Sequence, residues 1–527
     1  MARRSMTRRD FVKASAAGGA GALIPSAITS QTAGRPRAEK VQPNVLLMMT
    51  DQHSARVLLS RGHPHVRTPH LDRLARGGVT FENAICTYPV CTASRGSIVT
   101  GRWPHVRGPH LNVGSTESDA NKGLQPDAIM TETVLSERGY RTTHQGKWHI
   151  GDLSRHACYA GSGHYHREHW KALQEWRKTH PVDAPPGDAE LYGWPLYMTE
   201  PVKAAHEAWA KSAQDISLIG RVALPLEIDK TTWVTDRVIG DLRESEGHPF
   251  MATWSVAPPH AFWAVQDPYY SRVDPRDIEL PPSQTRPPHF DREPAARLAD
   301  LLGEDGMREY LRCYYGLVMQ VDDQVGRVIK VLEDSGRLDD TIIVFTSDHG
   351  DMQAAHQHVG KGTSAFYDEV IGVPLIIRYP RAIGGNRRVQ THVSGVDVMP
   401  TILDYCGFAA PAQCQGTSLR PLIEGHEDLS RPGFCERTHP TAQAVGRAIR
   451  TRQWKLAINL ENWSTGHESF TYRWPLELYD LSADPGETVN VGGQPKYSKV
   501  RRRLLNRLLA WMDETDDAWL DRLPAEL

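Results

Sequence analysis

The sequence lacks the features that mark a membrane-spanning or a nucleic-acid-binding protein. After the N-terminal segment, no apolar run reaches the roughly 20 residues that a helix needs to cross a bilayer. The 527 residues carry a formal net charge of −2, and a balance so close to zero favours neither nucleic acid nor an anionic membrane surface as a partner. The length is sufficient for one large domain and a smaller one.

Cysteine is scarce, and its spacing excludes the usual kind of zinc site. The seven cysteines are Cys86, Cys91, Cys158, Cys313, Cys406, Cys414 and Cys435. No interval between them matches the spacing of structural zinc ligands. Cys406 and Cys414 are close enough in sequence for a small disulfide loop in an oxidising compartment, and free buried thiols are the equally weighted alternative.

The N-terminus has the pattern of an export signal. Arg8 and Arg9 lie in a short polar run that ends at Lys13, and a mildly apolar stretch rich in alanine and glycine follows at 14–28. This pattern is typical of a bacterial twin-arginine signal. We expect residues 1–38 to be removed and the protein to be periplasmic or secreted, with a disordered basic tail as the alternative interpretation. Twin-arginine export carries folded proteins, which is compatible with a cytoplasmic modification of the chain before transport.

Continuous apolar runs of strand length recur along the chain and predict strands that are buried on both faces. These runs are residues 45–49, 249–257, 341–347 and 373–379. Helical periodicity is clearest at 306–335, which we expect to be core scaffold, and shorter helices are predicted at 68–77 and 130–138.

The last hundred residues have a different pattern. Residues 445–452, 454–460 and 476–481 predict short antiparallel strands, and a helix is predicted at 497–512. We therefore expect a small C-terminal subdomain at 431–527 after a larger domain at 41–430.

Polar residues follow two of the predicted buried strands. Asp51 ends the first strand, and Asp348 and His349 follow the strand at 341–347. Because ligands gather at the carboxyl ends of strands in open α/β sheets, the acid and imidazole of the later strand can complete a metal site begun by Asp51. Taken alone, Asp51 is more often a helix cap than a metal ligand.

The run CTASR at residues 91–95 places a cysteine at the head of a predicted helix, with Ile98 and Val99 as an apolar patch and Gly101 as a stop. A helix N-terminus carries partial positive charge and free N–H groups, which suit an anion or a nucleophile that must lose a proton. Without further context, such a cysteine is more often a buried structural thiol.

Several motifs, in a fixed order, carry a resemblance to a known family. They are Cys91-Thr92-Ala93-Ser94-Arg95 with Thr100-Gly101-Arg102, then Gly146-Lys147-Trp148-His149, Pro259-His260, Asp348-His349, and His356 with Gly360-Lys361. Together they resemble the formylglycine-dependent sulfatases of the alkaline phosphatase superfamily. The first motif is highly specific, and the stretch at 477–487 is also typical of the family, so the resemblance covers nearly all of the chain after the signal.

The resemblance implies an α/β fold and a covalent modification. The expected architecture is a large alkaline-phosphatase-like domain with a mixed, mostly parallel sheet between helices, plus a smaller C-terminal domain with a short antiparallel sheet and a helix. Cys91 would be oxidised to formylglycine by a maturation enzyme, and the hydrated aldehyde would be the nucleophile. Ala93 stands where the commoner form of the motif has proline, and the maturing enzymes differ in their tolerance of this exchange.

The resemblance also assigns a divalent metal to the carboxyl ends of the strands. Its ligands would be Asp51, Gln52, the modified Cys91, Asp348 and His349. The family usually has a second acid in place of Gln52, and glutamine also occurs in branches that contain choline sulfatases and phosphonate monoester hydrolases. An oxygen-rich site favours Ca²⁺, and the exchange of two oxygen donors for Gln52 and His349 keeps Mn²⁺ as an alternative.

The remaining motif residues receive catalytic roles from the resemblance. Arg95, Lys147 and Lys361 would offset the negative charge that develops on the sulfate. His149 would hold a formylglycine hydroxyl and later help to expel the sulfate. His260 would protonate the leaving alcohol, a task that suits the pKa of a histidine. The implied activity is that of a sulfuric ester hydrolase acting on a sulfated small molecule or polysaccharide.

An apparent insertion at 155–200 bears on the substrate. Its histidines and aromatic residues are His156, Tyr159, His164, Tyr165, His166, His169, Trp170, Trp176, His180, Tyr192, Trp194 and Tyr197. Aromatic faces with polar edges suit sugar recognition, which favours a polysaccharide sulfate. A segment that packs its own rings is an alternative interpretation, and a histidine-rich metal site is another.

Two other functions stay open at this point. A phosphonate monoester or phosphodiester hydrolase would use the same residues, and Gln52 with His349 favours it. A non-catalytic binder of sulfated glycans would keep Cys91 unmodified.

Overall fold

The computed structural model describes residues 42–58, 62–106, 123–125, 127–152, 165–181, 184–209, 217–282, 294–362, 366–439, 444–459 and 476–523. The predicted signal at 1–38 lies outside these residues, as do Cys158 and the insertion residues His156, Tyr159 and His164. Among the described residues, no helix combines the length and the apolar character needed to cross a membrane.

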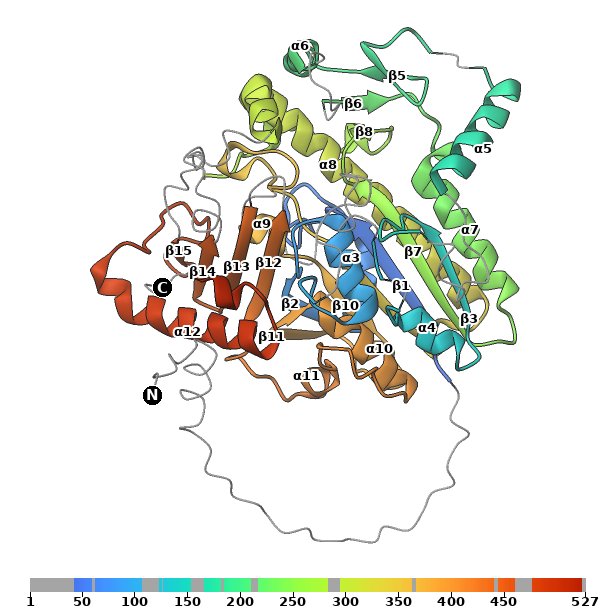
Figure 1. Ribbon diagram of the computed structural model, residues 1–527. Coiled ribbons are helices and arrows are strands. Elements are labelled where there is room, and N and C mark those ends of the chain that lie inside the picture. Colours follow the sequence, from blue (N-terminus) through green and yellow to red (C-terminus); the bar gives the residue numbers. More distant parts are fainter. Residues whose placement is uncertain are drawn as a thin grey trace, which may run out of the picture.

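A seven-stranded sheet forms the centre of the molecule (Figure 1). In spatial order its strands are β11 (Arg387–Ser394), β2 (Val79–Ile85), β10 (Leu375–Arg378), β9 (Thr341–Ser347), β1 (Asn44–Asp51), β7 (Phe250–Pro259) and β3 (Arg141–Gly146). Only β10 runs antiparallel to its neighbours. The other six strands therefore end at one edge of the sheet, and the expected mixed, mostly parallel sheet is confirmed.

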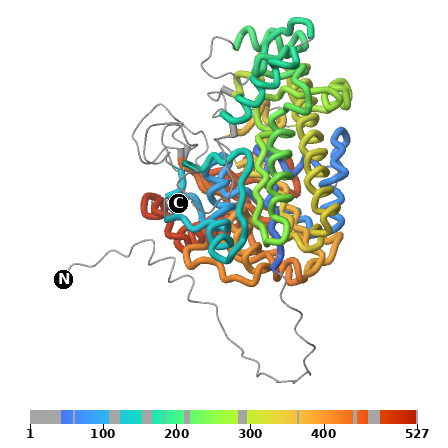
Figure 2. Tube along the Cα trace, turned by 90° about the vertical axis from the view of Figure 1, so that its right-hand side faces the viewer, coloured from blue at the N-terminus to red at the C-terminus, as the bar shows by residue number. Residues whose placement is uncertain are grey.

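Helices cover both faces of this sheet. Successive residues of β1 alternate between two hydrophobic clusters, with Val45 and Leu47 in one and Leu46 and Met48 in the other, as the pleat of a strand dictates. Both faces are buried by helices. The first cluster includes α3 (Cys91–Thr100), α4 (Thr131–Ser136) and α10 (Val398–Cys406), and the second includes α2 (Pro69–Arg76), α7 (Lys230–Glu244) and α8 (Pro294–Asp334). Figure 2 shows α7 and α8 side by side.

The predicted helices are confirmed with differences at their ends. Helix α8 contains the predicted 306–335 segment except its last residue, and its backbone leaves the helical conformation at Gly303 (φ 58°). Helix α2 has Thr68 at its N-cap, but the Thr68 side chain makes no cap hydrogen bond. Instead, the Asp322 carboxylate of α8 accepts the backbone N–H groups of His70 (3.1 Å) and Leu71 (2.8 Å), so the helix start is satisfied by a tertiary contact.

Four strands between Gly433 and Asp480 form a second sheet, which is antiparallel. Its strands are β12 (Gly433–His439), β13 (Ala444–Arg450), β14 (Trp454–Asn459) and β15 (Leu476–Asp480). Helix α12 (Ser498–Glu514) covers this sheet through a shared cluster that contains Leu508 and Met512. The expected antiparallel sheet and helix are confirmed, whereas β12 was not predicted from the sequence.

A third sheet lies beyond the carboxyl ends of the central strands, at the top of Figure 1. Its strands are β4 (Ala189–Leu191), β5 (Trp194–Tyr197), β6 (Ile219–Val222) and β8 (Trp263–Val265). Two helices lie next to this sheet, α5 (Tyr165–Thr179) and α6 (Glu200–Trp209). The sequence indicated an aromatic insertion here but predicted neither the sheet nor the 15-residue helix α5. The rings of Trp176 and Trp194 lie 5.9 Å apart, so part of the insertion does pack its own aromatic residues.

The described cysteines are all free thiols. Cys406 and Cys414 form no disulfide, and the Sγ of Cys414 contacts the carbonyl oxygen of Gly416 (3.8 Å). The structure thus agrees with the free-thiol alternative.

Candidate active site

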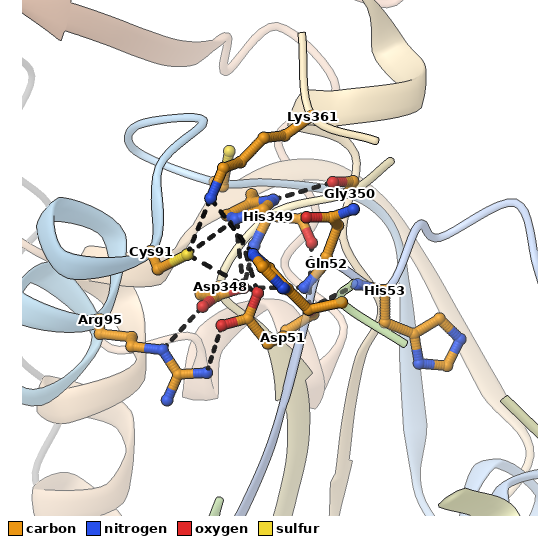
Figure 3. A network of polar contacts seen from close by, with 12 residues as sticks. Asp51, Gln52, His53, Cys91, Arg95, Asp348, His349, Gly350 and Lys361 are labelled. Carbon is orange, nitrogen blue, oxygen red and sulfur yellow. Dashed lines mark hydrogen bonds and ion pairs between the residues drawn. The ribbon is translucent and has the colours of Figure 1, made fainter. Parts of the chain in front are cut away.

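Two acids from neighbouring strands meet at the edge of the central sheet (Figure 3). Asp51 is the last residue of β1, and Asp348 directly follows β9. The Arg95 guanidinium of α3 lies between them, with its Nε donating to Asp348 Oδ2 (2.7 Å) and its Nη2 donating to Asp51 Oδ2 (3.3 Å). All three side chains are buried, so the two carboxylates are fixed by one cation.

The third nitrogen of the Arg95 guanidinium, Nη1, also donates hydrogen bonds within the protein. Its Nη1 donates to Ser255 Oγ (2.8 Å) and to the Lys147 carbonyl oxygen (3.0 Å). The family motif predicts that Arg95 offsets the negative charge that develops on the sulfate. In the structure its Nε and Nη2 donate to Asp348 and Asp51, two charge-assisted hydrogen bonds that hold the acids in place.

His349 presents one ring nitrogen to the two acids. Its Nδ1 donates to the Gly350 carbonyl oxygen (2.8 Å), and its Nε2 lies 3.7 Å from Asp51 Oδ1 and 3.3 Å from Cys91 Sγ. Burial opposes protonation of His349, but Asp348 and Cys91 raise its pKa to about 9. The anionic groups that keep the His349 imidazole protonated would also stabilise another positive charge at this position.

These groups fit a divalent metal. Asp51, Cys91, Asp348 and His349 are all buried and each offers one ligand atom, and the four atoms lie within 4.8 Å of one another. Two carboxylates and an imidazole whose other nitrogen is fixed by a carbonyl are a common metal-binding set.

Gln52 is held beside this set by residues that sequence analysis missed. Its Nε2 donates to Asp351 Oδ2 (2.7 Å), and its Oε1 lies on the side of the acids in Figure 3. Asp351 also accepts a hydrogen bond from the Tyr310 hydroxyl, and the Tyr314 hydroxyl donates to the Gln52 carbonyl oxygen (2.6 Å). Tyr314 lies in the 306–335 segment that the periodicity predicts as core scaffold, and no local signal marks Asp351 as part of the site.

Cys91 is the first residue of α3, and its thiol lies among cationic groups. Lys361 Nζ lies 3.4 Å from Cys91 Sγ, and Asp51 Oδ1 lies 3.7 Å away. Burial opposes ionisation, but Lys147, Lys361 and His349 lower the pKa of Cys91 well below its usual range, and a hydrogen bond with His149 acts in the same direction. The position therefore stabilises a negative charge on the side chain of residue 91.

The other predicted site residues surround the same point. Lys147 Nζ pairs with Asp51 Oδ2, and Asp51 and Cys91 raise the pKa of Lys147 although burial opposes this. His260 donates from Nδ1 to the Ala261 carbonyl oxygen (2.9 Å), and its Nε2 lies 3.4 Å from Lys361 Nζ. The structure thus brings together every residue that the sequence assigned to the site.

Comparison with known proteins identifies the arrangement. The family model of the sulfatases matches residues 43–408, which is more than half of the chain. The chain belongs to the sulfatase family. A second model, described as the C-terminal part of N-sulphoglucosamine sulphohydrolase, matches residues 361–514, and a twin-arginine signal matches residues 5–25. This sulfatase is a sulfuric ester hydrolase of the alkaline phosphatase superfamily, and its signal indicates export to the periplasm or beyond.

Individual relatives are distant in sequence but match nine tenths or more of this chain. An ulvan-active sulfatase of Formosa agariphila is 26% identical and covers 92% of this chain and 84% of its own. An N-acetylglucosamine-6-O-sulfatase of Bacteroides thetaiotaomicron is 26% identical, with 96% and 92% covered. The solved phosphonate monoester hydrolase of Agrobacterium radiobacter has a TM-score of 0.72 at 23% identity, with 90% and 96% covered. This last likeness supports the fold.

Proposed function

We propose that this sulfatase hydrolyses sulfate monoesters of carbohydrates with a formylglycine nucleophile made from Cys91. One observation carries the proposal. Cys91 Sγ stands at the head of α3 at 3.3 Å from His349 and 3.4 Å from Lys361, beside the two acids. The thiol occupies the place of the hydroxyl oxygens that the hydrated aldehyde would carry. Such a residue offers one hydroxyl for attack on sulfur and a second whose proton loss regenerates the aldehyde and releases sulfate.

We propose Asp51, Gln52, residue 91, Asp348 and His349 as ligands of one divalent metal. Ca²⁺ is the first choice because carboxylate and amide oxygens dominate the set, and Mn²⁺ is the alternative because His349 contributes nitrogen. When bound, the metal would polarise a sulfate oxygen and lower the pKa of the attacking hydroxyl.

The protein side chains supply charge and a proton. Lys361 and Lys147 flank residue 91 with positive charge that offsets the charge on the sulfate oxygens in the transition state. His260 lies next to Lys361 with Nε2 directed at it, and from there an imidazolium would give its Nε2 proton to the leaving alcohol.

Two observations favour a carbohydrate as the alcohol. Two relatives are an ulvan-active sulfatase and an N-acetylglucosamine-6-O-sulfatase. In addition, the third sheet places aromatic residues beyond the catalytic edge, where loops and small elements carry specificity.

A phosphonate monoester hydrolase is the second candidate, because Gln52 and His349 occupy the metal set and the phosphonate hydrolase of Agrobacterium radiobacter has the same fold. The two functions are separated by kcat/KM for 4-nitrophenyl sulfate and for the 4-nitrophenyl monoester of phenylphosphonate. We expect the sulfate to be preferred by orders of magnitude. A preference for the phosphonate of that size would overturn the sulfatase proposal.

A further inference from the structure

The hydroxyl of Tyr310 joins two parts of the active site that are far apart in the sequence. Tyr310 belongs to α8 and is fully buried, and its ring packs edge-on against Trp263 with the ring centres 4.7 Å apart. Its hydroxyl donates to Asp351 Oδ1 and accepts the Gly360 backbone N–H (3.1 Å). A carboxylate only accepts and an N–H only donates, so the direction of both hydrogen bonds is fixed. Burial and the Asp351 charge raise the pKa of Tyr310 well above its ordinary value, which keeps the donated proton on the hydroxyl.

One of the two hydrogen bonds of Tyr310 leads to Gln52. Asp351 Oδ2 accepts the Gln52 side-chain N–H (2.7 Å). Asp351 Oδ1 accepts the Tyr310 hydroxyl and the Gln353 backbone N–H (2.8 Å), so both carboxylate oxygens are held. An amide whose nitrogen faces a carboxylate turns its oxygen the other way, and Gln52 Oε1 lies on the side of the acids in Figure 3. Through Asp351, Tyr310 therefore helps to aim the oxygen that Gln52 would offer to a metal.

The other hydrogen bond leads to Lys361. Gly360 directly precedes Lys361 and has φ 71°, a left-handed conformation that favours glycine. Both backbone groups of Gly360 are bonded, since its N–H donates to Tyr310 and its carbonyl oxygen accepts the Met352 N–H (2.7 Å). The Lys361 ammonium group lies 3.4 Å from Cys91 Sγ (Figure 3). The Tyr310 hydroxyl therefore fixes the backbone from which this side chain extends to residue 91.

We propose that Tyr310 is a positioning residue that holds Gln52 and Lys361 in register around residue 91. This inference rests on the proposed function, in which Gln52 is a metal ligand and Lys361 offsets charge on the sulfate. Attack at sulfur needs both groups within about 0.5 Å of their working positions around one sulfate. Loss of the hydroxyl would release both, because Asp351 would lose one donor and the Gly360 N–H would be left without an acceptor.

Metal titration of Tyr310→Phe tests the contribution to Gln52 without turnover. The variant keeps the ring against Trp263 and removes only the hydroxyl. Protein stripped of metal with a chelator is titrated in a calorimeter with Ca²⁺ and, separately, with Mn²⁺, and we expect binding to be about 10–100-fold weaker than in the unaltered protein. In a Gln52→Ala background the same substitution should change the affinity by less than about twofold, because the amide that Tyr310 positions is gone. An unchanged affinity in Tyr310→Phe, or an equal loss in both backgrounds, would overturn this role.

Kinetics at saturating metal test the contribution to Lys361. The kcat/KM of Tyr310→Phe for 4-nitrophenyl sulfate should fall by about tenfold because the lysine is no longer held in place. In a Lys361→Met background the same substitution should lower kcat/KM by less than about twofold. Asp351→Asn should weaken metal binding in the same way but lose less kcat/KM at saturating metal, since Gly360 keeps its acceptor. Equal kinetic losses with and without Lys361 would contradict this contribution.

Tyr140→Phe is the matched control. Tyr140 is also buried, and its hydroxyl donates to the Pro43 carbonyl oxygen (2.9 Å), next to the first residues of β3 and β1 and thus at the opposite edge of the sheet from the active site. Both variants should lower the stability of the metal-free protein, but only Tyr310→Phe should weaken metal binding. A loss of stability without a change in metal affinity would reduce Tyr310 to a structural role. Failure of the mature enzyme to hydrolyse 4-nitrophenyl sulfate would count against the proposed function, and the titrations would still decide whether Tyr310 acts through Gln52.

Discussion

Two clusters of buried charge differ in how they are balanced. The active-site cluster consists of Asp51, Asp348, Arg95, Lys147 and Lys361 around Cys91 and His349. The docking cluster consists of Asp368, Arg450, Lys455 and Glu487, and it joins α9 (Asp368–Ile371) of the catalytic region to β13 and β14 of the second sheet. The first cluster has three fixed cations for two carboxylates, whereas the second has two of each.

The docking cluster is satisfied by its own members. Lys455 Nζ lies 2.5 Å from Asp368 Oδ1 and donates to Glu487 Oε2 (2.8 Å) and to the Phe366 carbonyl oxygen (2.8 Å). Arg450 Nη2 donates to Asp368 Oδ2 (2.9 Å). Such a closed network fixes the relative position of two parts of the chain and leaves nothing for a ligand to neutralise.

The active-site cluster, in contrast, places cations around the Cys91 thiol. Burial of charge alone therefore does not mark a functional site. The informative property is the surplus of one sign at a position that a ligand can reach. The first two variants below each break one cluster, the other two change His260 and His105 outside them, and all four are ordered by expected effect.

Asp51→Asn should have the largest effect. It removes a carboxylate that Arg95 and Lys147 both contact, and it removes a proposed metal ligand. Turnover of 4-nitrophenyl sulfate should fall by about 10³-fold or more, and metal affinity by about 10–100-fold. Steady-state kinetics and metal titration check this, with the exposed Asp277→Asn as a control. Full activity in Asp51→Asn would contradict the assignment of the site.

Lys455→Met should damage stability and spare the chemistry. It leaves the buried Glu487 and the partly buried Asp368 with one cation fewer, which costs about 3–5 kcal/mol of the free energy of unfolding. Denaturant unfolding measures this loss, with the exposed Lys499→Met on α12 as the matched control. The kcat/KM per folded molecule should stay within about twofold of the original value. A stable Lys455→Met protein with lowered kcat/KM would reverse the roles given to the two clusters.

His260→Gln should have an effect that depends on the leaving group. A sugar alkoxide needs a proton to leave, whereas 4-nitrophenolate does not. We therefore expect kcat for a sugar sulfate to fall by about 10²-fold, with a much smaller change for 4-nitrophenyl sulfate. Rates on both substrates at saturation provide the measurement. Equal losses on the two substrates would exclude His260 as the general acid.

His105→Gln should have the smallest effect, and it should depend on pH. Burial opposes protonation of His105, but Glu436 raises its pKa above the ordinary value, with Asp517 acting in the same direction and Arg447 against it. The stabilisation by protonated His105 is present below its unfolded pKa of roughly 6.5 and is lost as pH rises through the folded pKa. The difference from the original protein, about 1 kcal/mol, should thus shrink from acidic to alkaline pH in unfolding titrations. A difference that grows with pH would contradict this assignment.

Features that depend on the pattern of neighbouring residues, such as buried strands and the acids at their ends, could be predicted from the sequence. Val45–Met49 could be predicted as a buried strand because its residues are all apolar, and Asp51 followed as a strand-end acid. The roles of Lys147 and Lys361 were predicted only through family motifs, since a lone lysine in a loop is usually exposed.

Contacts between distant residues could not be predicted in this way. Gln52 is held by Asp351, which lies 299 residues away in the sequence, and Asp322 satisfies the start of α2 from 251 residues away. Arg95 was expected to face the sulfate because its charge suits an anion, but only the fold shows that two acids already take its hydrogen bonds. The sheet built around the aromatic insertion was missed because its strands are three or four residues long.

The proposed mechanism requires that residue 91 acts as formylglycine. The most direct test is the mass of the tryptic peptide that ends at Arg95, taken from protein made in its native host. Conversion replaces the SH group and one Cβ hydrogen by an aldehyde oxygen, and we expect the active protein to show the mass of that product. An intact Cys91 in protein that hydrolyses sulfate esters at full rate would rule out the formylglycine nucleophile.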